Sequence, residues 1–250
     1  MKIQNNTILN YLNEPEVYSL KANILDIVNE NGQYEVETTA TPFYVKGGGQ
    51  PSDIGWLKTD DLSLEVLQVI SKADGKIYHV LKDENVTALQ IGFEVELIVN
   101  HEIRHKHNAI HTAGELICGA IRTLGYQWDV SSAIHYPDNA SVEYNVELSE
   151  LEKIKLKEKL QERLCEHISK GSDVHIATYF DRDSVIQQCG YFPDYVNSDI
   201  GIRVVKVLDN VFGRPCKGTH LKNINLLKEV IVRKIKNSKG RLQIKYDTVF

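Results

Sequence analysis

Runs of apolar residues separated by polar turns occupy the first hundred residues of the chain. The stretch YSLKANILDIVNENGQYEVETTATPFY contains two extended runs around the turn NENGQ, and LSLEVLQVISKADGKIYHVLK repeats this arrangement around KADGK. A further run ends in FEVELIVN. Strands at this spacing predict a small β-barrel or sandwich, which we assign to residues 1–97.

From residue 101 the apolar period becomes that of a helix. The residues at helical spacing are Ala113, Leu116, Ile117, Ala120, Ile121 and Leu124. With Gly125 as a stop signal, they predict an amphipathic helix over residues 104–124. A second helix is predicted to begin at Ser149, because Glu152 completes a capping box three residues later, and to end at Gly171.

Three strand-like stretches follow: SDVHIATYF, IGIRVVKVLD and the hairpin EVIVRKIKNSKGRLQIKY. We therefore expect residues 98–250 to form a second domain in which helices pack on an antiparallel sheet. The whole chain is predicted to be α+β, with a β-barrel-like domain followed by this one.

Between the first two predicted hairpins lies the loop GGGQPSDIG, residues 47–55. Its successive glycines permit backbone angles that side chains forbid. Such a loop is either a tight corner of the barrel or a place where a ligand approaches the backbone. Its sequence matches neither a phosphate-binding loop nor a dinucleotide-binding fingerprint.

The composition is that of a folded enzyme or binding protein. The chain has 250 residues, of which 42% are hydrophobic, and its four cysteines are too sparse to predict a disulfide framework. No apolar run is long enough for a membrane span, and the first residues lack the apolar segment of a signal peptide, so a cytoplasmic protein is expected.

A net charge of −5 argues against non-specific coating of nucleic acid, and we expect neither DNA nor a membrane as a partner. The last hairpin is locally basic all the same. It is either a solvent-exposed face or a surface for RNA phosphates.

Two pairs of residues with a spacing of four carry the candidate chemistry. His111 and Glu115 are predicted to lie on one face of a helix, and Cys216 and His220 lie in the loop stretch CKGTH. Together they offer sulfur, nitrogen and oxygen donors, a set that suits tetrahedral zinc. Each pair also arises by chance, as a surface pair or an isolated cysteine and histidine.

Four stretches taken together resemble one protein family. In chain order they are TPFYVKGGGQPSDIG, RHKHNAIHTAGELI, GIRVVKVLD and PCKGTH. They resemble the AlaX family of alanyl-tRNA editing proteins, which are free-standing relatives of the editing domain of alanyl-tRNA synthetase. The resemblance implies a zinc-dependent hydrolase that deacylates tRNA for alanine mischarged with serine or glycine, acting at the acceptor end of the tRNA.

The resemblance also implies a set of metal ligands. The ligand positions of the family fall on His111, Cys216 and His220, and its second histidine falls on Glu115. Glu115 is then either a ligand through oxygen or a catalytic base beside a metal-bound water. His107 could pair with His111 instead, and a site that has lost zinc is a further alternative.

Other family positions predict contacts to the substrate. By the resemblance, Gly48, Gly49 and Gln50 belong to the wall between the two predicted domains, near the amino-acid pocket, and Lys217 replaces a glycine of the family's CGGTH loop. Lys217 either obstructs the substrate or contacts a phosphate or ribose.

Two threonines next to the ligand positions are further candidates. Thr112 and Thr219 either orient water and substrate or make backbone hydrogen bonds. Three other histidines, His105, His135 and His167, have no partner at ligand spacing and are expected to be surface or packed residues.

Overall fold

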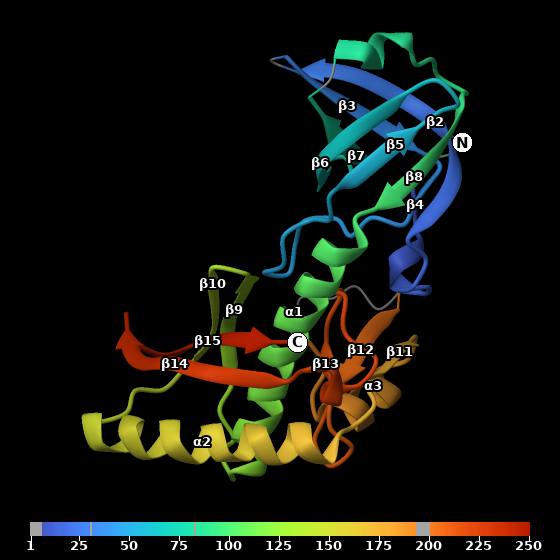
Figure 1. Ribbon diagram of the computed structural model, residues 1–250. Coiled ribbons are helices and arrows are strands. Elements are labelled where there is room, and N and C mark those ends of the chain that lie inside the picture. Colours follow the sequence, from blue (N-terminus) through green and yellow to red (C-terminus); the bar gives the residue numbers. More distant parts are fainter. Residues whose placement is uncertain (1–6, 31, 83, 194–200) are drawn as a thin grey trace. The chain divides into compact units, whose positions relative to one another are not determined.

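The computed structural model describes residues 7–30, 32–82, 84–193 and 201–250 (Figure 1). The chain divides into two compact units, Met1–His105 and Lys106–Phe250. The first unit thus takes in the opening residues of helix α1 (His101–Thr123). Within the described part, no helix is long and apolar enough to cross a membrane.

The first unit is a closed barrel of six antiparallel strands, which confirms the predicted barrel. The barrel order is β2-β3-β7-β6-β5-β8. Its strands are β2 (Ser19–Glu30), β3 (Gln33–Thr38), β5 (Gly55–Lys58), β6 (Ser63–Ser71), β7 (Ile77–Leu81) and β8 (Glu94–Val99). The minor elements are β1 (Ile8–Leu9), η1 (Asn10–Leu12), β4 (Ala40–Thr41) and η2 (Glu84–Ala88).

Both hairpins expected from the sequence are present, β2 with β3 and β6 with β7. Each contains a register shift, between Ile24 and Asp26 in β2 and between Val66 and Gln68 in β6. Such bulges bend and twist a strand, which helps a short sheet to close on itself. The short strand β5 was not predicted, because it lies directly after the glycine-rich loop.

The glycine-rich loop begins with a tight turn. Gly47 and Gln50 form an isolated antiparallel bridge, and the two residues between them, Gly48 and Gly49, have φ angles of 52° and 76°. Two central residues with positive φ are the requirement of a type I′ turn, which explains glycine at both positions.

A buried ion pair anchors the end of this loop. The guanidinium of Arg104 donates from Nε to both oxygens of Asp53, at 2.8 and 2.9 Å, and from Nη2 to the carbonyl of Pro42 at 2.7 Å. Asp53 also accepts from the backbone N–H of Tyr44 at 2.6 Å. Both charged side chains are almost completely buried, so the first unit encloses an ion pair that is fully hydrogen-bonded.

The second unit is α+β, as predicted, with antiparallel sheets and helices packed against them. Besides most of α1 it contains α2 (Glu150–Lys170), α3 (Arg182–Cys189) and η4 (Ile224–Leu226). One sheet has the order β14-β15-β10-β9, and a smaller one has the order β11-β12-β13. The strands are β9 (Val130–Tyr136), β10 (Asn139–Tyr144), β11 (His175–Tyr179), β12 (Ile202–Lys206), β13 (Arg214–Pro215), β14 (Glu229–Ser238) and β15 (Arg241–Val249).

Helix α1 supplies much of the core of this unit. Its residues from 107 to 121 are buried except at Glu115, which is partly exposed. The helix starts three residues earlier than position 104, because β8 ends at Val99 and the side chain of Asn100 accepts the N–H of Ile103. The hairpin β9–β10 and the short helix α3 were not predicted.

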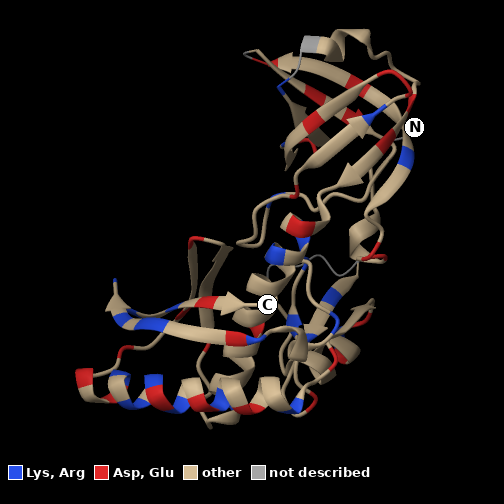
Figure 2. Ribbon diagram, in the orientation of Figure 1, with Lys and Arg blue, Asp and Glu red and all other residues tan. Residues whose placement is uncertain are grey.

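Helix α2 covers the edge strand β14. It begins with the predicted capping box between Ser149 and Glu152 and ends at Gly171. Figure 2 shows charged residues of both signs along the helix. Near its middle, Gln161 donates to the carbonyl of Val230 at 2.8 Å and accepts from the N–H of Val232 at 2.9 Å. The side chain therefore pairs with an edge that would otherwise be open to another strand.

Candidate metal centre

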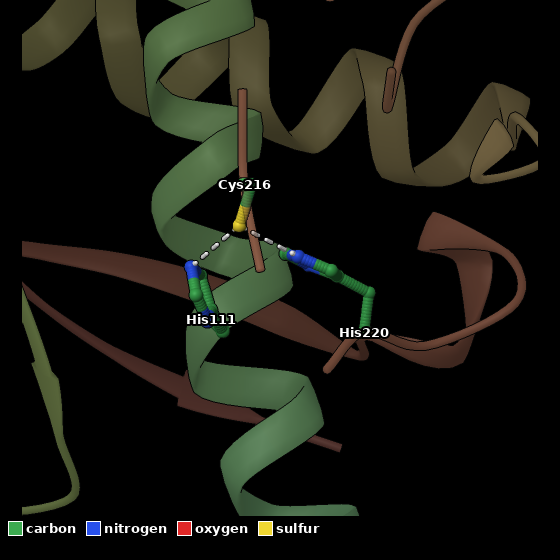
Figure 3. A group of neighbouring side chains, drawn as sticks. All are labelled: His111, Cys216 and His220. Carbon is green, nitrogen blue, oxygen red and sulfur yellow. Dashed lines mark hydrogen bonds between the residues drawn. The ribbon is translucent and has the colours of Figure 1, made fainter. Parts of the chain in front are cut away.

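Three donor atoms converge in the second unit (Figure 3). Sγ of Cys216 lies 3.5 Å from Nε2 of His111 and 3.3 Å from Nε2 of His220. The donor atoms of all three residues lie within 4.8 Å of one another. Among the described residues, this is the group of histidine, cysteine and acidic side chains that could hold a metal ion.

The chain brings these residues together from positions far apart in the sequence. His111 lies in the middle of α1, whereas Cys216 and His220 lie in the loop after β13. Thr112 is fully buried and accepts the N–H of Leu221 at 2.9 Å, which ties the end of the loop to the helix. Within the loop, Gly218 donates its N–H to Sγ of Cys216 at 3.3 Å.

The spacing of the donors fits zinc. For Zn–S and Zn–N bonds of about 2.3 and 2.05 Å at a tetrahedral angle, sulfur and nitrogen are separated by about 3.6 Å. The separations of 3.5 and 3.3 Å between Cys216 and the two histidines are close to that value. Three protein ligands would leave one position free, as in catalytic zinc sites.

The buried surroundings of these donors favour their uncharged forms. Burial, followed by the neighbouring rings of His135 and His220, lowers the pKa of His111 well below its ordinary value. Burial also lowers the pKa of His220 and raises the pKa of Cys216 to about 12. A divalent cation would favour the thiolate, because it would replace the lost hydration of that charge.

Glu115 lies beside this group but not within it. Its Oε1 is 4.0 Å from Nε2 of His111, and its Oε2 is 3.4 Å from Nε of Arg214. Burial raises the pKa of the Glu115 carboxyl, although the charge of Arg214 and a hydrogen bond with Cys216 act in the opposite direction. The carboxylate therefore faces the ligands on one side and an arginine on the other.

No protein-family model matches the chain. It is 27% identical to the alanyl-tRNA editing protein AlaX-L of Pyrococcus horikoshii, over 94% of the chain and 56% of that protein. It is also 27% identical to AlaX-M of Methanosarcina barkeri, over 80% of the chain and 82% of that protein. The chain is thus similar to AlaX editing proteins over most of its length.

Parts of larger proteins match the chain as well. An alanine–tRNA ligase of Thermoplasma acidophilum is 29% identical over 80% of the chain but only 22% of the ligase. The chain thus spans a little over half the length of AlaX-L and a minor part of the ligase. The resemblance drawn from the four sequence stretches is confirmed by these matches.

The remaining predicted residues of the chain lie in different surroundings. Lys217 is exposed next to Cys216, and Thr219 is fully buried. In the first unit, Gly48 is exposed in its turn, and Gln50 is 1% exposed. The amide of Gln50 can therefore contact a ligand only if the groups that cover it move aside.

His107, the alternative partner for His111, is buried one turn earlier in α1. It does not belong to the group of converging donors found among the described residues.

Two neighbours of the candidate metal centre carried no signal in the sequence. The ring of His135 stacks on that of His111, with 4.0 Å between ring centroids and 20° between planes. Nδ1 of His135 lies 2.7 Å from the hydroxyl of Tyr246. Burial, with a smaller effect from Arg214, lowers the pKa of His135 to about 3. His135 was expected to be a surface or packed residue, and it is packed, but against a proposed ligand.

Proposed function

We propose that the chain is a zinc-dependent aminoacyl-tRNA deacylase that acts in trans, in the cytoplasm, on tRNA for alanine mischarged with serine or glycine. The observation that carries the proposal is the convergence of His111, Cys216 and His220 at separations suited to zinc. We infer the substrate from the similar proteins, which are alanyl-tRNA editing proteins and alanine–tRNA ligases.

Editing of this kind has a physical reason. A synthetase pocket for a small apolar side chain cannot strongly reject an analogue with one added hydroxyl, so a second, hydrolytic site is needed. Zinc bound by the three ligands would polarise the ester carbonyl or lower the pKa of a water molecule. The protein contributes the binding, the orientation and the proton acceptor.

We assign the role of proton acceptor to Glu115. Its Oε1 stands 4.0 Å from Nε2 of His111, close enough to share a water molecule with the centre, and Glu115 is not one of the three converging donors. Arg214 holds the other oxygen at 3.4 Å and so limits the rotation of the carboxylate. Ligation by Glu115 requires that its side chain leave this arrangement.

Five other residues are assigned to the substrate by the same proposal. Lys217 is exposed at the start of the CKGTH loop, where its ammonium would meet a phosphate or ribose of the tRNA end. Thr219 has a buried side chain, so it is proposed to affect the substrate indirectly, by fixing the conformation of the loop. Gly48, Gly49 and Gln50 are proposed to bind the aminoacyl group.

The metal content and the hydrolysis of mischarged tRNA test the proposal together. The purified chain is expected to hold about one zinc and to release serine or glycine from mischarged tRNA for alanine. Cys216→Ala should lose both properties, because it removes the thiolate. The matched control is Cys165→Ser, since Cys165 is an exposed free cysteine on α2 and should retain both.

Two outcomes would contradict the proposal in different ways. A chain with zinc that releases no amino acid from these tRNAs would favour another aminoacyl ester as substrate, which a panel of mischarged tRNAs would identify. A chain without zinc or hydrolysis that still binds tRNA for alanine would be a non-catalytic relative. Glu115→Gln separates the role of base from that of ligand. If Glu115 is a base, the variant should keep its zinc while the rate of hydrolysis falls, typically by a factor of about 10²–10⁴.

A further inference from the structure

His135 and Tyr246 belong to one row across the four-stranded sheet. Ala140 of β10 pairs with His135 of β9 on one side and with Tyr246 of β15 on the other. Directly opposed residues of neighbouring strands point to the same face. The two side chains therefore start about 10 Å apart, two strand spacings. They meet over the methyl group of Ala140, with Nδ1 of His135 at 2.7 Å from Oη of Tyr246.

The direction of this hydrogen bond follows from a second one. Oη of Tyr246 lies 3.1 Å from the backbone carbonyl of Ile110, which can only accept. The tyrosine proton is therefore used there, and the hydroxyl must accept from Nδ1–H of His135. This arrangement fixes both the tautomer and the ring orientation of His135. It is anchored on α1 through the carbonyl of Ile110, the residue before His111.

Helix α1 leaves space for this contact at Gly114. A Cβ at position 114 would overlap Cε1 of His135 and would lie 2.6 Å from Oη of Tyr246. Glycine inside a helix costs about 1 kcal/mol relative to alanine. The helix thus carries a destabilising residue at the one turn where His135 and Tyr246 approach it.

The consequence falls on His111. The outer torsion angle of a histidine side chain is broad, so a buried imidazole needs a neighbour to hold its plane. The ring of His135 lies nearly parallel to that of His111 at 4.0 Å, while Nε2 of His111 faces Cys216. We propose that His135 is a positioning residue of the metal centre, which holds the imidazole of His111 in the plane that directs Nε2 towards the metal.

This inference rests on the proposed metal centre but not on the proposed substrate, and a binding experiment with cobalt(II) tests it without tRNA. Cobalt(II) occupies tetrahedral zinc sites and its visible spectrum reports the ligand geometry. The full chain and its variants are titrated with cobalt(II) in competition with a chelator. His135→Ala is expected to weaken binding by about 10–100-fold, as the loss of a residue that orients a ligand does, and to change the visible bands.

Tyr246→Phe provides a second variant that preserves the packed volume. It removes the acceptor of Nδ1–H but leaves both rings, so binding should weaken by about tenfold, the lower end of the same range. This variant carries the test if His135→Ala does not fold.

The matched control is His79→Ala. His79 is also fully buried, and it is hydrogen-bonded to Val36 and Thr41 in the first unit. This variant should lose stability while its cobalt affinity and spectrum remain those of the unchanged protein.

Three results would overturn the inference. If His135→Ala and Tyr246→Phe bind cobalt as tightly as the unchanged chain and give the same spectrum, His135 has no positioning role. If His79→Ala weakens binding equally, the effect belongs to general destabilisation. If the unchanged chain binds no cobalt, the proposed metal centre itself is wrong, and the role of His135 falls with it.

Discussion

The buried pair between Arg104 and Asp53 should dominate the stability of the first unit. Arg104→Ala would leave the carboxylate of Asp53 buried with the N–H of Tyr44 as the remaining donor described for it. Removing one partner of such a pair typically costs about 3–5 kcal/mol, because an uncompensated charge stays in the interior. A domain of this size is stable by only about 5–15 kcal/mol, so the variant should be close to unfolding.

The two tryptophans allow this loss to be measured in one unit at a time. Trp56 lies in β5 of the barrel, and Trp128 lies in the second unit. In a Trp128→Phe background, urea unfolding followed by fluorescence reports the barrel. With a urea dependence of about 2 kcal/mol per molar, a loss of about 4 kcal/mol moves the midpoint down by about 2 M.

The double variant Asp53→Asn with Arg104→Met is the control for charge. It removes both ions, so it should be more stable than Arg104→Ala alone, since no uncompensated charge remains. A loss below about 1 kcal/mol for Arg104→Ala, or an equal loss for the single and double variants, would refute the reasoning.

Three further outcomes are expected. Burial lowers the pKa of His79 from 6.5 to about 4, so between these pH values the unfolded chain binds the proton more readily than the folded barrel does. The free energy of unfolding of the barrel should therefore fall by up to about 3 kcal/mol as the pH falls through that range. His79→Gln should make the unfolding midpoint reported by Trp56 less dependent on pH. Gln161→Leu removes the partner of two backbone groups of β14. The free energy of unfolding of the second unit, followed by Trp128 fluorescence, should fall by about 1–3 kcal/mol. The control Gln127→Leu, at an exposed residue, should lower it much less. Free zinc at 100 times its dissociation constant should stabilise the second unit by about 2.7 kcal/mol and leave the Trp56 transition unchanged; an equal effect in Cys216→Ser would contradict the assignment of that ligand.

Features with a local physical cause were predictable from the sequence. The capping box at Ser149 and Glu152 and the two barrel hairpins depend on residues only a few positions apart. His111 was identified through helical spacing, and Cys216 with His220 through a short loop spacing. The donor types of the two pairs suggested one zinc site, although each pair also arises by chance, and the resemblance of four stretches to one family then favoured a shared site.

Features that arise from strand register were not predictable. His135 reaches Tyr246 because both strands flank Ala140 in the sheet, a relation between positions 135, 140 and 246 that no local period encodes. The same holds for Arg214 of β13, which meets Glu115 of α1 only in the folded chain. Position 135 therefore looked like an isolated histidine until the sheet was assembled.

The two interior glycines of α1 respond in opposite ways to a common stabilising strategy. Replacing a helical glycine by alanine normally adds about 1 kcal/mol of stability. At Gly119 the new methyl group would meet Cδ1 of Leu208 at 2.9 Å, the end of a flexible side chain that can turn aside. At Gly114 it would strike an imidazole held by a hydrogen bond. An engineer who seeks a more stable protein should therefore change position 119 and leave position 114 alone.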